Sequence, residues 1–119
     1  VSSSIRDRGH DYWTGTVYTT NRRIWEHDEE FKQLLRETRA MAVDMETATL
    51  FCTGFTNRIP TGALLLVSDQ PMIPEGIKTE KMDNYVTQKY VSDHVKIGIN
   101  ALQMIRDEKK TVKHLKFDW

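Results

Sequence analysis

The chain has 119 residues, a length that suits one compact domain, and 39% hydrophobic and 29% charged residues are ordinary for a globular protein. Its 17 basic and 17 acidic residues give zero net charge, which argues against attachment to nucleic acid or to an anionic membrane through the overall field. One cysteine, Cys52, excludes an internal disulfide framework and a cysteine-based zinc site. We therefore expect a reduced, soluble, cytoplasmic protein.

The first expected elements follow a short polar start. Residues 1–8 (VSSSIRDR) lack an initiator methionine and the apolar core of a signal peptide, so we expect a piece of a longer protein. Thr14–Thr20 is rich in β-branched and aromatic residues, which predicts a strand. Asp28 is the expected N-cap of a helix in which Phe31, Leu34 and Leu35 have helical spacing.

The middle of the chain is predicted to alternate strand, helix and strand. Met41–Val43 is a short apolar run typical of a buried strand. The helix that follows is expected to end near Gly54 and Asn57, and its apolar face consists of Ala48, Phe51, Cys52 and Phe55. Ala63–Val67 is apolar without alternation, as in a central parallel strand, and too short to span a bilayer. Ser68–Gly76, with two prolines, should be a loop.

The last large element is a long helix predicted over Thr79–Lys109. Its apolar stripe is expected to be core or subunit interface, and it consists of Val91, Val95, Gly98, Ile99, Leu102 and Ile105. Lys96 and Asn100 interrupt the stripe, which argues against a membrane helix. Thr111–Trp119 is a basic and aromatic tail, read either as a solvated end or as an extended segment on a neighbour.

This order of elements predicts an α/β fold with a parallel sheet. Glu46 and Asp69 each follow a predicted strand, about one helix plus one strand apart, so the two carboxylates are expected to lie over one pocket. Glu46 would accept hydrogen bonds from a vicinal diol such as a ribose. Asp69, if partly buried, would hold a proton at neutral pH. Together they suit cleavage of a nucleoside's glycosidic bond; the alternative is that Asp44 and Glu46 charge a helix start and Asp69 caps a turn.

Three sequence blocks carry a resemblance to a known family. AVDMETA at residues 42–48 followed by LVSD at 66–69 resembles the paired signature of the nucleoside phosphorylase and nucleosidase superfamily. Within it, TTNRRIWE at 19–26, RAMAVDME at 39–46 and VSDQP at 67–71 are similar to bacterial nucleosidases that act on AMP. The resemblance runs from about Gly15 to Gly98. It implies a three-layer α/β/α fold with a mixed central sheet.

The resemblance also implies roles for single residues. Glu46 would hold the ribose 2′- and 3′-hydroxyls, Met45 would pack on the sugar, and Asp69 would protonate or hydrogen-bond adenine N7. Water would then attack C1′ and give adenine and ribose 5-phosphate, without a metal or an organic cofactor. Asp44 stands where many relatives carry glutamate, so its role in substrate binding is open. Arg23 occupies one position of the family's stacking aromatic, which leaves Trp25 as a candidate.

Two arginines follow the first predicted strand, and the sequence allows two interpretations of them. Arg22 and Arg23 match a phosphate bidentately, whereas a solvated turn is the alternative. The four histidines have no spacing that makes a metal site.

Residues 1–12 resemble none of the family's first strands, glycine-containing phosphate loop or water-activating acid. We therefore expect residues 1–119 to be the C-terminal portion of one catalytic domain, inactive alone, from a homo-oligomeric enzyme of purine salvage. Three alternatives stay open: a purine nucleoside phosphorylase that uses phosphate in place of water, a non-catalytic nucleotide-binding module, and an α/β interaction domain.

Overall fold

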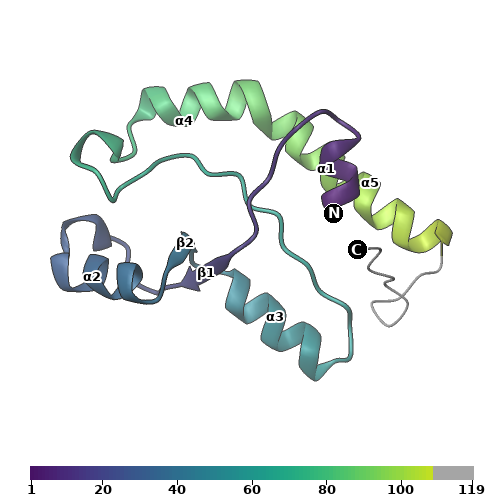
Figure 1. Cartoon of the computed structure of the whole chain (residues 1–119), viewed down its shortest axis with the longest axis horizontal. Helices are drawn as coiled ribbons and strands as arrows, with labels where there is room; N and C mark the ends of the chain where they lie inside the picture. Colours follow the sequence, from purple (N-terminus) through teal and green to yellow (C-terminus); the bar gives the residue numbers. More distant parts are fainter. Residues whose placement is uncertain (109–119) are drawn as a thin grey trace.

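The computed structural model describes residues 1–108, so the predicted tail Thr111–Trp119 and Lys109 lie outside the described residues. Figure 1 shows a long helical arm that runs opposite the strands and the two middle helices, with an extended segment between the two sides. In chain order the elements are α1 (Ser2–Arg6), β1 (Thr16–Thr19), the 3-10 turn η1 (Trp25–His27), α2 (Glu29–Glu37), β2 (Ala40–Asp44), α3 (Thr47–Thr56), the 3-10 turn η2 (Pro74–Gly76), α4 (Glu80–Val86), the π-helical turn η3 (Thr87–Val91) and α5 (Ser92–Glu108).

The two predicted strands before the middle helix are confirmed. β1 lies inside Thr14–Thr20, β2 contains Met41–Val43, and the two pair in parallel so that Thr19 is opposite Asp44. The α/β fold class is confirmed with them. The predicted burial of Met41–Val43 is wrong, because the three residues are half-buried or exposed and Met41 and Ala42 border a cavity instead of packed side chains.

Helix α2 forms as the sequence predicts and buries Phe31 and Leu35, whereas Leu34 is exposed. The Asp28 carboxylate accepts a hydrogen bond from the Phe31 amide (3.0 Å), which confirms Asp28 as the N-cap. The Phe31 ring meets Tyr18 edge-on at a centroid distance of 5.4 Å and Trp25 at 5.8 Å. Phe31 and Leu35 are 4% and 2% exposed, so this helix closes one small core against β1 and η1.

Helix α3 forms as predicted, but its apolar face is not buried. Cys52 and Phe55 are exposed, as are Ala48 and Phe51, and Gly54 is the one buried residue of this helix. Apolar periodicity produces a buried face only where another element packs on it. Among residues 1–108, α3 makes its contacts with β1 near its first turn, so its outer face stays uncovered.

The predicted central strand at Ala63–Val67 does not form. Its apolar side chains are half-buried or exposed, and the segment crosses the molecule in an extended path (Figure 1). A strand exists through hydrogen bonds to a neighbouring strand. Within residues 1–108, no backbone hydrogen bond connects Ala63–Val67 with another segment, and the sheet consists of β1 and β2.

The long helix is confirmed as the continuous run α4–η3–α5, with the Thr79 hydroxyl accepting a hydrogen bond from the Met82 amide (3.3 Å). The apolar stripe is not core among residues 1–108, because its five large members, Val91, Val95, Ile99, Leu102 and Ile105, are exposed; the alternative, a subunit interface, stays a prediction. The buried residues of α5 are instead Ile97 and Ala101, and α1 packs against α5.

Helix α1 was absent from the sequence prediction, since residues 1–8 show no helical periodicity. Its Ile5 is buried, and its Ser4 hydroxyl donates to Met104 Sδ on α5 (3.3 Å). The α1–α5 contact is therefore a second small core, separate from the one around Phe31. Within residues 1–108 no helix has the length and apolar character needed to cross a membrane.

Candidate active site

Strands β1 and β2 end side by side, and a polar cluster joins their ends to the start of α3. The Thr19 hydroxyl donates to Asp44 Oδ1 (2.7 Å) and accepts from the Ala48 amide (2.9 Å). The Thr47 amide donates to Asp44 Oδ2 (2.8 Å), and so does the Thr47 hydroxyl. These bonds fix how α3 leaves the sheet, and with it the residues between Asp44 and Thr47.

Asp44 is held in its ionised form by this cluster. Burial by itself raises the pKa of the Asp44 carboxyl, but the hydrogen bonds from Thr47 and Thr19 outweigh it and leave the pKa below its ordinary value. Both carboxylate oxygens accept hydrogen bonds from protein donors, so Asp44 connects the end of β1 with the start of α3. The sequence prediction missed Thr19 and Thr47, because their proximity to Asp44 depends on the parallel register, which no local motif encodes.

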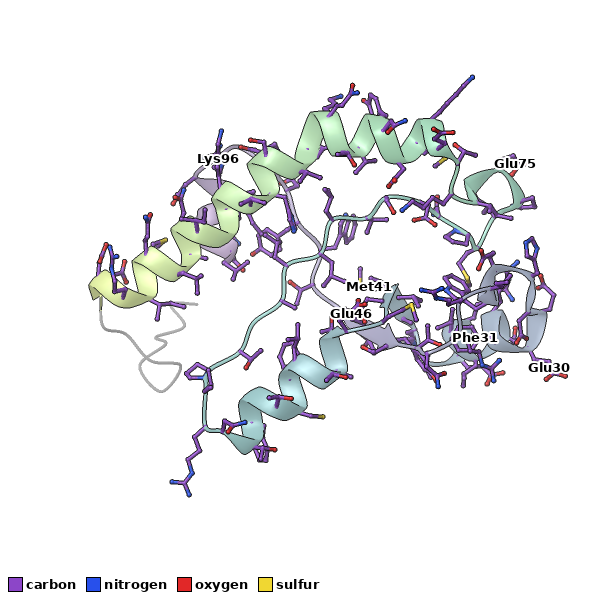
Figure 2. All side chains as sticks on the ribbon, turned by 180° about the vertical axis from the view of Figure 1, so that it is seen from behind. Glu30, Phe31, Met41, Glu46, Glu75 and Lys96 are labelled. Carbon is purple, nitrogen blue, oxygen red and sulfur yellow. The ribbon has the colours of Figure 1, made fainter. Side chains whose placement is uncertain are left out.

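Met45 and Glu46 lie in the short link that this cluster fixes. Glu46 occupies the N-cap position of α3, but its side chain does not cap the helix; its Oε2 accepts from the Met45 amide at 3.3 Å. Its side chain is exposed, at the junction between the strands and α3 (Figure 2). An exposed carboxylate at this position keeps acceptor sites for hydroxyl groups of a ligand.

Asp69 follows the extended segment and begins a loop with a fixed shape. The Ser68 hydroxyl donates to Asp69 Oδ1 (2.5 Å), and Asp69 is half-buried. The Gln70 amide then donates to the Gly76 carbonyl (2.8 Å), and a Cβ at Gly76 would lie 2.1 Å from the Gln70 carbonyl oxygen. Any larger residue at position 76 would therefore change the path of the loop behind Asp69.

Lys78 connects this loop electrostatically to α4. Its Nζ pairs with Asp83 Oδ1 at 2.9 Å. The pKa of Lys78 is raised above its ordinary value, mainly by the hydrogen bond to Asp83, with smaller contributions from the charges of Asp83 and Asp69. A cation thus lies within electrostatic range of the Asp69 carboxyl.

The structure does not pair the two predicted carboxylates directly. Among residues 1–108, no hydrogen bond joins Glu46 and Asp69, and each is held by its own sequence neighbour. Their placement over one pocket therefore stays a prediction.

A cavity of about 460 Å³ at the ends of β1 and β2 brings some of the predicted residues together. Met45 and Arg22 line it with Tyr18 and Thr19. Arg22 pairs with Asp28 Oδ2 at 2.6 Å. Arg23 is exposed and Trp25 packs on Phe31, so these two lie outside the cavity lining.

A second polar cluster lies at the start of α5. Asp93 accepts hydrogen bonds from the Arg8 guanidinium, through Nε at 2.8 Å, and pairs with His10 Nε2 at 2.5 Å. These two partners lower the pKa of Asp93 to about 2. Within residues 1–108, no three His, Cys, Asp or Glu side chains gather in a way that would hold a metal ion.

Comparison with known proteins extends over most of the chain. A family model described as the phosphorylase superfamily matches residues 1–103. AMP nucleosidase from Escherichia coli K12 is 42% identical over 96 residues, which are 80% of this chain and 20% of that protein, and the O157:H7 protein matches equally. The crystal structure of AMP nucleosidase from Bacteroides thetaiotaomicron VPI-5482 is 54% identical with a TM-score of 0.71, over 90% of this chain and 41% of that one. The chain therefore spans about a fifth of the curated relatives' length.

Proposed function

The chain belongs to the phosphorylase superfamily, and on that premise we propose that it is the C-terminal portion of an N-glycosidase that hydrolyses AMP to adenine and ribose 5-phosphate. The observation that carries the proposal is the similarity to the AMP nucleosidases of Escherichia coli and Bacteroides, which spans both carboxylate-bearing segments. The exposed Glu46 at a helix start and the loop-held Asp69 are the groups that this reaction requires.

In this proposal Glu46 binds the ribose. Its carboxylate accepts hydrogen bonds from the 2′- and 3′-hydroxyls and stabilises the positive charge that develops at C1′ as the glycosidic bond breaks. The Thr19–Asp44–Thr47 bonds hold the link in which Glu46 lies, so Asp44 acts as a positioning residue. Met45, which lines the neighbouring cavity, packs on the sugar face.

Asp69 acts on the base. A protonated Asp69 donates its proton to adenine N7, which makes adenine the better leaving group, and the bond between C1′ and the base breaks. The oxygen of a water molecule then bonds to C1′ and the water releases one proton to solvent, which gives ribose 5-phosphate, and Asp69 takes up a proton from solvent for the next cycle. The Ser68 hydroxyl, 2.5 Å from Asp69 Oδ1, fixes the carboxyl's orientation.

The segment after β1 is assigned to the rest of the nucleotide. Arg22 and Arg23 are the proposed phosphate ligands, and Arg22 lines the cavity beside Met45. Trp25 is the proposed stacking partner of the base; its present packing on Phe31 means that it would have to turn.

The complete enzyme is proposed to be a cytoplasmic homo-oligomer of purine salvage that needs the polypeptide beyond this chain for activity. The small share of the relatives that the chain spans supports the need for further polypeptide. The exposed stripe on α5, which includes Val95, Ile99 and Leu102, supports contact with another subunit.

The test is adenine release by a chimaera in which this chain replaces the matching part of the Bacteroides enzyme. Release from AMP without phosphate is expected, and Asp69→Asn should lower it by about two orders of magnitude or more. Glu46→Gln should also lower it strongly. Glu75→Gln, an exposed acid in the loop after Asp69, should leave it unchanged.

Three results would contradict the proposal, and each points to a different alternative. Release that requires phosphate indicates a phosphorylase. AMP binding without release indicates a binding module. No AMP binding by a folded chimaera indicates an interaction domain.

A further inference from the structure

The loop that follows Asp69 closes on itself through its backbone. The Gln70 amide donates to the Gly76 carbonyl (2.8 Å), the Ile73 amide to the Gln70 carbonyl (3.2 Å) and the Gly76 amide to the Ile73 carbonyl (3.0 Å). Because Gln70 and Gly76 are bonded to each other, the chain enters and leaves the loop at one place. Asp69, one residue before this bonded pair, and Lys78, two residues after it, therefore lie near each other.

Lys78 lies between two carboxylates and pairs with one of them. Its Nζ is 2.9 Å from Asp83 Oδ1 on α4, whereas no ion pair among residues 1–108 joins it to Asp69. The pKa of Lys78 is raised mainly by its hydrogen bond to Asp83, and the charges of Asp83 and Asp69 add to this effect. The Asp69 carboxylate has a different hydrogen-bond partner, the Ser68 hydroxyl, at 2.5 Å.

The Lys78–Asp83 ion pair matters for Asp69 because of what an unpaired lysine would do. A cation beside a carboxyl group favours its ionised form, whereas a general acid needs the protonated form. When Lys78 is paired with Asp83, the opposite charges of the two groups largely cancel at Asp69. The side chains of Lys78 and Asp83 are half-exposed, so the pair itself contributes little to folding stability.

Other charged groups lie near this loop, but in the described part of the chain none of them pairs with Lys78 or Asp69. Figure 1 shows the loop at the same end of the molecule as η1 and α2. The charged residues of η1, of the first turn of α2, of the loop and of α4 that form no ion pair among residues 1–108 are Glu26, His27, Glu30, Glu75, Glu80 and Lys81. Asp83 is therefore the partner that decides where the charge of Lys78 acts.

We propose that Asp83 is a positioning residue for the glycosidic cleavage: it holds Lys78 on α4 and keeps the lysine from pairing with Asp69, so that Asp69 can carry the proton for the base. The proposal rests on the proposed function in one respect, the assignment of Asp69 as the acid. The charge arrangement is tested without hydrolysis, so the two proposals fail separately.

The first measurement is an NMR titration of the Asp69 carboxyl in the 119-residue chain. Asp83→Asn leaves Lys78 without its partner and should lower the Asp69 midpoint by about 0.3 pH units or more, the effect of one nearby charge in a largely solvated site. The double variant Lys78→Met with Asp83→Asn removes both charges and should return the midpoint to the wild-type value. Glu29→Gln, which breaks an ion pair of similar length on α2 (3.0 Å), should leave it unchanged.

The second measurement is the pH dependence of adenine release by the chimaera with the Bacteroides enzyme. The alkaline limb, on which the acid loses its proton, should move to lower pH in Asp83→Asn, so that release on this limb falls by about twofold or more. The double variant should restore it. A purely structural role of Asp83 would lower release equally at all pH values and would not be repaired by the removal of Lys78.

Two outcomes would overturn the proposal. One is an Asp69 midpoint that stays in place in an Asp83→Asn chain that is folded by circular dichroism. The other is a shift that persists when Lys78 is also replaced, because the effect would then not act through the lysine. A chimaera that releases no adenine while the NMR shifts occur as expected would contradict the proposed function, and would still support the effect of Asp83 on Asp69.

Discussion

Two regions of the chain have apolar, strand-like sequence, but only one of them forms strands. β1 and β2 pair with each other, α2 closes over them, and Thr19 and Asp44 lock their ends. Ala63–Val67 is at least as apolar, but it has no strand beside it and borders a cavity. Apolar composition thus brings a segment towards the interior, whereas a hydrogen-bonding neighbour decides whether it becomes a strand.

Helix α2 packs on neighbouring elements and helix α3 leaves its apolar face uncovered. Substitutions that compare the two helices give the largest predicted change in the free energy of unfolding. Phe31→Ala removes a ring that is 4% exposed and packs on two aromatic neighbours, so the free energy of unfolding should fall by about 3 kcal/mol. Phe55→Ala on α3 removes an exposed ring and should change it by less than about 0.5 kcal/mol. Urea denaturation of the 119-residue chain measures both. Equal losses would mean that α3 is packed in solution.

The polar cluster of Thr19, Asp44 and Thr47 at the strand ends gives the second-largest expected loss in the free energy of unfolding. Asp44→Ala leaves the donors of Thr19 and Thr47 without their acceptor, and the free energy of unfolding should fall by about 2 kcal/mol. Thr19→Val tests whether the cluster acts as a unit. The double variant should lose less than the sum of the two single losses. Simple additivity would show that the Thr19–Asp44 bond does not stabilise the chain.

A substitution at the end of α3 is expected to stabilise the chain, by a smaller amount than the losses above. Arg58 has a positive φ of 57°, and the helix ends with hydrogen bonds from Ile59 to Gly54 and from Arg58 to Phe55. Arg58→Gly removes the strain of a side chain in the left-handed region and should raise the free energy of unfolding by about 1 kcal/mol. Arg36→Gly, inside α2, should lower it by up to about 1 kcal/mol. A loss for both would contradict this geometry at Arg58.

The ion pairs between the segment after α1 and the start of α5 add a pH-dependent effect, the smallest of the four. Arg8 and His10 lower the pKa of Asp93 to about 2 in the folded chain, from an ordinary value of 3.8. The ionised Asp93 carboxylate therefore stabilises the folded chain fully at pH values above 3.8. This contribution is lost as the pH falls from 3.8 to about 2. Arg8→Gln should move the Asp93 midpoint, followed by NMR, upwards. An unchanged midpoint would mean that Arg8 does not pair with Asp93 in solution.

What the sequence predicts well is local. The Asp28 cap, the strand at Thr16–Thr19 and the helix after Glu46 follow from signals within a few residues, and each one is present. Glu46 at the start of α3 follows from the same kind of signal.

What the sequence predicts poorly depends on distant partners. The buried residues of α5, Ile97 and Ala101, could not be predicted, because α1 packs against α5 and residues 1–8 show no helical periodicity. The third strand was predicted from apolar composition, which does not reveal whether a neighbouring strand is present. For the same reason the distance between Glu46 and Asp69 could not be predicted, since Asp69 is carried by that unpaired segment.

The most direct test of this account is hydrogen–deuterium exchange at the amides of Ala63–Val67, in the 119-residue chain and in the chimaera with the rest of the Bacteroides nucleosidase. The account predicts fast exchange in the chain alone and strong protection in the chimaera, while the β1 and β2 amides are protected in both. Equal protection of Ala63–Val67 in the two proteins would contradict it, because the strand would then form without a partner.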